Sequence, residues 1–196
     1  MFRTLRPLIL ASESPRRKRL LQSIGLEFKV HPSNEEESGD SFACPADAAE
    51  EWATRKAVSV SRLFPDSWVL GADTVVVLDG RIFGKPADRS AARKMLESLS
   101  GRIHEVITGM CLANAEKDIR RTGAVITQVQ FKGLAETEIE AYIRTGEPMD
   151  KAGAYGIQGI GAFLVKWISG SYSNVVGLPV CHVVDWLTAE GIIEPD

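Results

Sequence analysis

The stretch from Trp68 to Phe83 reads WVLGADTVVVLDGRIF, and it holds the strand signals on which the fold depends. Its two apolar runs, Trp68–Leu70 and Val75–Leu78, predict buried strands. Between the second run and Arg81–Phe83 stands Asp79-Gly80, a dipeptide that favours the tight turn of a β-hairpin. The stretch therefore predicts a sheet that contains antiparallel neighbours.

Helical patterns lie on both sides of this hairpin. Small and apolar residues recur near one helical face over Pro45–Phe64, and Asp88 is a capping residue for a helix to about Leu99, closed by Gly101. The other expected helices are Pro15–Ile24, Ala135–Thr145 and Leu178–Ala189, and the other expected strands are Pro7–Ala11, Phe28–His31, Glu105–Ala113, Ala124–Phe131 and Phe163–Ile168. Hairpins combined with helical crossovers predict an α/β fold with a mixed sheet. The length predicts one domain over residues 1–196.

The composition is that of an ordinary globular chain with a slight acidic excess. Its 23 basic and 26 acidic side chains leave a net charge of -3, which argues against broad nucleic-acid binding. No apolar run has the length of a signal peptide or a membrane span, so we expect a cytoplasmic protein with no membrane partner. Cys44, Cys111 and Cys181 lack a paired zinc spacing and are expected to be small core residues.

The first stretch with candidate chemistry is LASESPRRKRLL, from Leu10 to Leu21. Ser14 suits the N-cap of a helix, and Pro15 suits its first position. Arg16 and Arg17 then stand at the positive end of the helix dipole, where cations destabilise a helix unless an anion binds. The stretch is either a solvated basic helix start or a site suited to phosphate.

Two further short motifs each allow a structural and a chemical interpretation. In GADTVV, Asp73 is either a capping or turn aspartate at a strand end, or a metal ligand or general base at the edge of a sheet. In FGKP, Lys85 stands between Gly84 and Pro86. That lysine belongs either to a plain β-turn or to a rigid loop that brings its ammonium to a phosphate oxygen.

Two longer stretches complete the set of unusual segments. SNEEES, Ser33–Ser38, has the composition of a solvated loop, although a glutamate there could hold a divalent cation. The segment Asp150–Pro179 contains six glycines, which indicate tight turns and close backbone approaches. Because it also contains buried-type aromatic residues, we interpret it as a structured loop that encloses a substrate and not as a linker.

Six motifs in a fixed order resemble one family. LASESPRRKRLL, GADTVV, GKP, SGRIHEVITG, DKAGAYGIQG and GSYSNVVGLP follow the order seen in the Maf proteins, over about Leu8 to Pro179. The form DKAGAYGIQG resembles the dTTP/UTP pyrophosphatase branch. The resemblance implies a single elongated domain with a mixed, curved sheet flanked by helices, as in Maf and Ham1-like proteins, and a substrate cleft between two lobes.

The resemblance also implies an activity. Members of this branch hydrolyse a nucleoside triphosphate, here dTTP, UTP or a modified pyrimidine nucleotide, between the α and β phosphates, and so clear unwanted nucleotides from the pool. The implied cofactor is a divalent cation, Mg²⁺ or Mn²⁺, and the implied assembly is a homodimer. The matching positions imply catalytic roles for Asp73, Lys85 and Lys56, substrate contacts for Ser12, Arg16, Arg17, Thr74 and Gln158, and a metal site at Glu37 and Asp73.

Some assignments stay open at this point. The chain has EEES where Asp-Glu-Ser is common in the family, so either Glu36 or Glu37 could serve the metal, and the loop spacing and the following serine favour Glu37. Asp73 could act as a base, as a metal ligand or as both. A second hypothesis is a nucleotide-binding regulator of cell division with incidental hydrolysis. The complete set of Arg16, Lys56, Asp73 and Lys85 favours the enzyme, because binding alone does not need the carboxylate.

Overall fold

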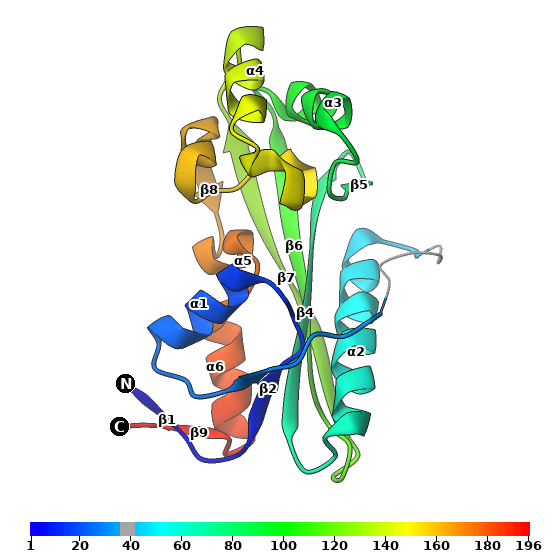
Figure 1. Ribbon diagram of the computed structural model, residues 1–196, viewed down its shortest axis with the longest axis vertical. Coiled ribbons are helices and arrows are strands. Elements are labelled where there is room, and N and C mark those ends of the chain that lie inside the picture. The colour runs from blue at the N-terminus through cyan, green and yellow to red at the C-terminus, as the bar shows by residue number, and fades with distance from the viewer. Residues whose placement is uncertain (36–41) are drawn as a thin grey trace.

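Three long strands run through much of the length of the molecule in the computed structural model, which describes residues 1–35 and 42–196 (Figure 1). They are β4 (Trp68–Leu78), β6 (Ile103–Asn114) and β7 (Ile119–Phe131), and neighbours among them are antiparallel. The other strands of this seven-stranded sheet are β2 (Leu8–Leu10), β3 (Lys29–Val30), β5 (Arg81–Phe83) and β8 (Val165–Ser169). The order is β3-β2-β4-β6-β7-β8, with β5 paired to β4. Because β2 is parallel to both β3 and β4, the sheet is mixed, and the expected α/β class is confirmed.

The helices begin where the sequence supplies caps. Ser14 accepts a hydrogen bond from the backbone N–H of Arg17 at 3.4 Å, and Asp88 accepts one from Ala91 at 2.7 Å. The α-helices are α1 (Pro15–Ser23), α2 (Pro45–Leu63), α3 (Arg89–Leu99), α4 (Glu136–Arg144), α5 (Tyr172–Val176) and α6 (Val180–Ala189), and the 3₁₀ helices are η1 (Glu147–Asp150), η2 (Ala152–Ala154) and η3 (Gly159–Leu164). Within the described ranges, no helix is both long enough and apolar enough to cross a bilayer.

The helix α2 packs unusually close to the sheet, because glycines on β4 and β6 face small residues of the helix. A Cβ atom on Gly71 would lie 2.4 Å from the carbonyl oxygen of Ala53, and one on Gly109 would lie 2.2 Å from that of Ala49. Any side chain at these two positions would force the helix outward. The close approach sets the height of Lys56 above the sheet.

Two larger hydrophobic clusters lie in two lobes along the long axis of the molecule, and two smaller ones involve α2 and the sheet. Figure 1 shows the elements of the two lobes. The lower lobe contains β2, β3, α1 and α6, and its core joins Leu10 and Leu21 to Leu178 and Leu187. The upper lobe contains β5, α3, α4, β8 and the three 3₁₀ helices. Its core includes Phe131 of β7, Leu96 of α3 and Ile139 of α4. The strands β4, β6 and β7 pass through both lobes, which gives the elongated shape implied by the resemblance.

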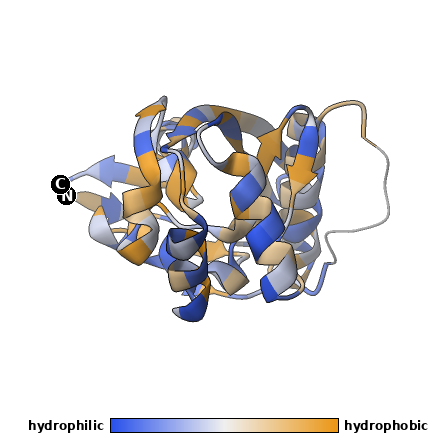
Figure 2. Ribbon diagram, turned by 90° about the horizontal axis from the view of Figure 1, so that it is seen from above, coloured by the Kyte–Doolittle hydropathy of each residue, from blue (hydrophilic) through white to orange (hydrophobic). Residues whose placement is uncertain are grey.

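The two termini lie side by side at one end of the molecule (Figure 2). There β1 (Phe2–Thr4) and β9 (Ile193–Pro195) form a small antiparallel sheet. Each of these strands has three residues, which is too short for a hydrophobic period to be recognised. The sequence therefore did not predict this pair.

The structure corrects several of the sequence predictions. β4 is continuous from Trp68 to Leu78, so Asp73 lies inside a strand and not at a strand end, although β4 has no sheet partner at this residue on the side away from β6. Because Gly159–Leu164 folds as a 3₁₀ helix, β8 begins at Val165 and not at Phe163. The expected last helix begins only at Val180, after Pro179, and α5 precedes it. Of the cysteines, Cys111 is buried, whereas Cys44 and Cys181 are exposed and are not core residues.

Candidate active site

The main pocket lies beside the middle of β4, where this strand has a sheet partner on one side only. On the side away from β6, β2 pairs with β4 only at residues 68–70, and β5 pairs with it only at residues 76–78. A pocket of about 580 Å³ lies at this opening, and residues 73–76 of β4 line it. The lower lobe contributes Ala11–Arg17, and the upper lobe contributes Asp150–Ala152 and Tyr155–Gln158. The expected cleft between two lobes is thus present, with a volume usual for a small-molecule site.

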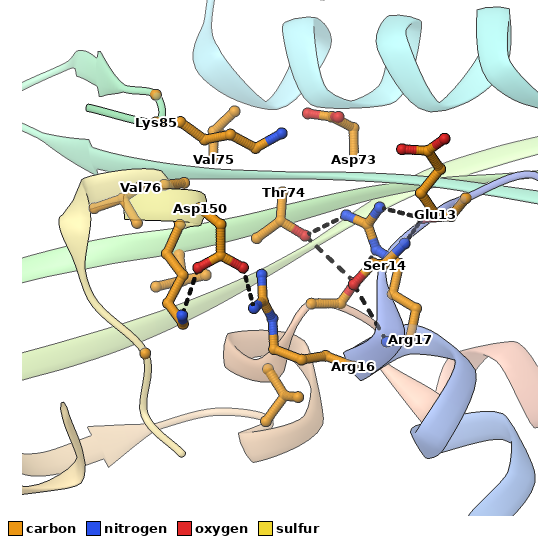
Figure 3. Close-up of a pocket in the computed structure, with 18 of the residues that line it drawn as sticks. Glu13, Ser14, Arg16, Arg17, Asp73, Thr74, Val75, Val76, Lys85 and Asp150 are labelled. Carbon is orange, nitrogen blue, oxygen red and sulfur yellow. Dashed lines mark hydrogen bonds and ion pairs between the residues drawn. The ribbon is translucent and has the colours of Figure 1, made fainter. Parts of the chain in front are cut away.

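A buried ion pair forms one wall of this pocket. The Nζ atom of Lys56, on α2, donates a hydrogen bond to Oδ1 of Asp73 at 2.5 Å. The side chain of Lys56 is 10% exposed and that of Asp73 is 4% exposed. Figure 3 shows Asp73 on the face of β4 that is covered by α2, with Thr74 on the opposite face. Alternation along one strand thus sends the carboxylate and the hydroxyl to different sides of the same site.

Arg17 joins the start of α1 to β4 and to the α5–α6 loop, on the face of β4 opposite to α2. Its guanidinium donates to the Ser12 hydroxyl at 3.0 Å, to the Thr74 hydroxyl at 3.0 Å and to the carbonyl oxygen of Gly177 at 2.8 Å. Thr74 also shares a hydrogen bond with the Thr108 hydroxyl of β6 at 2.9 Å. These contacts hold the start of α1 against β4 and the loop between α5 and α6.

A second arginine of the same helix reaches across the opening. Nη1 of Arg16, in the lower lobe, lies 3.1 Å from Oδ2 of Asp150 in the upper lobe, and the two side chains point toward one another in Figure 3. Asp150 also accepts a hydrogen bond from Lys151 at 2.6 Å. Burial acts to raise the pKa of Asp150, but Lys151 and Arg16 outweigh it and hold that pKa below its ordinary value. The mouth of the pocket is therefore bridged by charged groups from both lobes.

Eight of the nine site residues expected from the sequence line this one pocket. They are Ser12, Arg16, Arg17, Lys56, Asp73, Thr74, Lys85 and Gln158. Lys85 and Gln158 are exposed, so they stand at the rim, whereas Asp73 and Lys56 lie in the wall. The ninth residue, Glu37, lies outside the described residues, as does Glu36.

Sequence reasoning overlooked several residues of the lining. Tyr155 closes the upper side, and its hydroxyl lies 2.7 Å from Nε2 of His104 in the buried interior. Burial lowers the pKa of His104 to about 4, so the imidazole is neutral at pH 7. Trp52, Glu13 and Lys151 also line the pocket. The aromatic residue inside the glycine-rich motif DKAGAYGIQG was the available signal for Tyr155.

Motifs far apart in the sequence therefore meet at one site, and known proteins share them. The family model described as Maf-like protein matches residues 7–190. The chain belongs to the Maf family. Relatives named dTTP/UTP pyrophosphatase cover nearly all of it. The protein of Geotalea uraniireducens is 51% identical over 95% of this chain and 96% of its own length. That of Syntrophus aciditrophicus is 48% identical over 94% and 90%.

Solved structures resemble this Maf family member in fold. The Ham1 protein of Staphylococcus aureus superposes with a TM-score of 0.57 at 16% identity, covering 94% of this chain and 99% of that one. This likeness concerns the architecture of the mixed sheet and its helices. The chemistry of the Maf site has to be argued from its own residues.

Proposed function

We propose that this Maf family member is a nucleoside triphosphate pyrophosphatase that hydrolyses dTTP and UTP between the α and β phosphates. The products are the nucleoside monophosphate and pyrophosphate, and the reaction would clear these and modified pyrimidine nucleotides from the pool. The observation that carries the proposal is the buried Lys56–Asp73 pair in the wall of a pocket that Arg16, Arg17 and Lys85 also line. Relatives that are 48% and 51% identical and named dTTP/UTP pyrophosphatase support the same substrates.

The basic groups of the pocket suit a triphosphate chain. Arg16 at the first turn of α1 and Lys85 at the rim present positive charge from two directions. The helix N-terminus adds backbone N–H donors and the positive end of its dipole. Charge develops on several oxygens when a phosphoanhydride breaks, so dispersed cations stabilise the transition state more than one cation could. Arg17 acts differently, because it holds Ser12 and Thr74 in place.

Asp73 is the group proposed to act on the attacking water. Its ion pair with Lys56 fixes the carboxylate at the pocket wall, with little freedom to rotate. A carboxylate held in this way orients a water molecule and accepts its proton as the bond to the α phosphorus forms. We also propose that Lys56, beside it, neutralises charge on the departing pyrophosphate.

The donor set of the pocket fits a divalent cation of the Mg²⁺ type. Within the described part of the chain, no cluster of three or more His, Cys, Asp or Glu could hold a metal by itself. Asp73, Glu13 and Glu35 do line the pocket with carboxylate oxygens. Mg²⁺ usually takes one or two carboxylates and completes its shell with water and substrate phosphates, which matches this arrangement. Bound there, the cation would neutralise phosphate charge; Glu37 is proposed to assist.

Gln158 is proposed to select the base. Its amide carries both a donor and an acceptor, which match the edge of uracil or thymine. A site with such hydrogen bonds penalises a base that leaves them unpaired. Removing them in Gln158→Ala is expected to lower kcat/KM for UTP and dTTP about tenfold, which corresponds to one or two hydrogen bonds.

The test is a product analysis with purified protein and Mg²⁺ or Mn²⁺. dTTP, UTP, CTP, ATP and GTP are each incubated with the wild-type chain, and nucleoside monophosphate and pyrophosphate are quantified. Diphosphate and inorganic phosphate as products would place the cleavage elsewhere. Absence of pyrophosphate from every substrate would refute the enzyme. Purine nucleotides turned over as fast as dTTP would refute the pyrimidine assignment alone.

The enzyme is preferred to a division regulator that only binds nucleotide. A binding protein has no use for a buried carboxylate–ammonium pair at its pocket wall. The homodimer implied by the resemblance stays a prediction, which sedimentation at micromolar concentration checks. The expected cytoplasmic location and the expected lack of a nucleic-acid partner likewise stay predictions.

A further inference from the structure

The segment from Gly156 to Gly161, which carries Gln158, is held at one end by a single carboxylate. Oε1 of Glu147 accepts a hydrogen bond from the backbone N–H of Gly161 at 2.9 Å, and Oε2 accepts one from that of Ile160 at 3.0 Å. Burial acts to raise the pKa of Glu147, but these two donors outweigh it and lower that pKa. The group is therefore ionised at neutral pH, and both contacts are charge-assisted.

The other end of the segment is held through a buried tyrosine. The Tyr142 hydroxyl donates to Oε1 of Glu147 at 2.9 Å and accepts from the backbone N–H of Gly156 at 3.2 Å. The ring of Tyr142 is 1% exposed and belongs to the core of the upper lobe. Its hydroxyl therefore offers the segment a fixed point that does not move with the surface.

Apart from the start of the 3₁₀ helix η3 at Gly159, the composition of the segment gives its backbone little rigidity. Gly156, Gly159 and Gly161 give it high backbone freedom, and Ile160 is 55% exposed. Close contacts leave no room for side chains here. A Cβ atom on Gly159, where φ is +71°, would lie 2.8 Å from Oε2 of Glu147, and one on Gly161 would lie 2.4 Å from the Tyr142 hydroxyl.

We propose that Glu147 and Tyr142 are positioning residues for base recognition, which hold both ends of residues 156–161 so that Gln158 faces the pyrimidine. Neither residue lines the pocket, so each acts through the segment and not on the substrate. The inference rests on the proposed function, because it concerns how the same site binds UTP. Ordering the segment before the substrate arrives lowers the entropy cost of binding, which strengthens UTP binding and not the chemical step.

Two variants test the proposal, with a matched control. Tyr142→Phe removes the hydroxyl and keeps the buried ring. Glu147→Gln keeps the shape and replaces one acceptor oxygen by an NH₂ group, which cannot accept a hydrogen bond. The control is Glu138→Gln on α4, the helix that also carries Tyr142; Glu138 accepts a hydrogen bond from the backbone N–H of Ala135 at 3.0 Å and pairs with Lys132, both outside residues 156–161. All three lose a carboxylate or hydroxyl contact to a backbone N–H.

Tyr142→Phe and Glu147→Gln are expected to raise the KM for UTP about five- to tenfold, the equilibrium equivalent of roughly one hydrogen bond, with kcat within about twofold of wild type. Hydrogen–deuterium exchange of residues 156–161 should be faster in both variants and unchanged in Glu138→Gln. In a Gln158→Ala background the Tyr142→Phe substitution should have no further effect on KM, because the two changes act on one contact.

The outcomes separate this inference from the proposed function. A wild-type KM in both variants, unchanged exchange in the segment, or fully additive effects with Gln158→Ala would each overturn the positioning role while the enzyme assignment stands. A wild-type chain that releases no pyrophosphate from UTP would overturn the proposed function and the inference together. If Glu147→Gln does not fold, Tyr142→Phe decides by itself, since its core packing is retained.

Discussion

Replacing Asp73 by asparagine is the sharpest test of the proposed chemistry. The substitution keeps the shape of a side chain in the middle of β4 and removes its charge and its basicity. The neighbouring Lys56 ammonium, 2.5 Å away, keeps an oxygen to which it can donate. The pocket rim, with Arg16 and Lys85, is untouched, so nucleotide binding should stay measurable.

The substitution is expected to affect turnover and stability to different extents, so the two effects can be measured separately. Loss of a general base lowers turnover by about 10²- to 10⁴-fold. Removing one partner of a buried ion pair costs about 3–5 kcal/mol of stability, and a small domain has only about 5–15 kcal/mol in total. Asp73→Ala should show this full loss of stability, because it leaves the Lys56 ammonium without the carboxylate. Asp73→Asn should lose less, because the amide oxygen still accepts from Lys56.

Pyrophosphate release, urea unfolding and calorimetric titration with UTP measure the three quantities. The double variant Asp73→Leu with Lys56→Met serves as a control, because it removes both buried charges and should regain stability over Asp73→Ala without regaining activity. A folded Asp73→Asn variant that turns over UTP at the wild-type rate would remove the carboxylate from the mechanism.

Three other predictions each test a single part of the structure. Lys85→Ala should raise the KM for UTP and leave the unfolding midpoint unchanged. Arg17→Ala should raise that KM and also lower the midpoint, since it breaks three hydrogen bonds. Equal unfolding midpoints for the two variants would contradict this difference. The folded-state pKa of His104, about 4 against an ordinary 6.5, means that the unfolded chain binds the proton first as the pH falls. Stability is therefore lost from about pH 6.5 downward, and the unfolding free energy of wild type relative to His104→Gln should fall by about 2 kcal/mol between pH 7 and pH 5. A constant difference in urea unfolding would contradict that pKa. Gly109→Ala places a Cβ atom 2.2 Å from the backbone of α2, so it should lower the free energy of unfolding by about 1–3 kcal/mol or more and also lower activity. The control Gly133→Ala, whose Cβ atom would have no heavy atom within 4 Å, should leave thermal unfolding unchanged.

Much of the local structure follows from short patterns in the sequence. Asp79 and Gly80 both adopt positive φ, at 52° and 74°, as the predicted hairpin turn requires. Ser14 and Asp88 cap their helices as expected. Such features depend on a few neighbouring residues, so the sequence determines them without knowledge of the rest of the chain. The candidate site residues were found in a different way, through motifs whose order resembles a family.

Other features depend on which surfaces meet, and only the tertiary structure decides these. Gly71 stands between the two predicted strands Trp68–Leu70 and Val75–Leu78, yet it lies inside one continuous strand, where α2 packs too closely for a side chain. That packing places Lys56 beside Asp73, 17 residues away in the chain.

Glu147 gives no sequence signal either, since its partners are backbone N–H groups that converge on it only after the upper lobe has folded. Local propensity determines where helices and turns begin. The pairing of buried charges and the anchoring of loops are instead determined by burial, which removes water as a competing partner and makes each long-range contact specific.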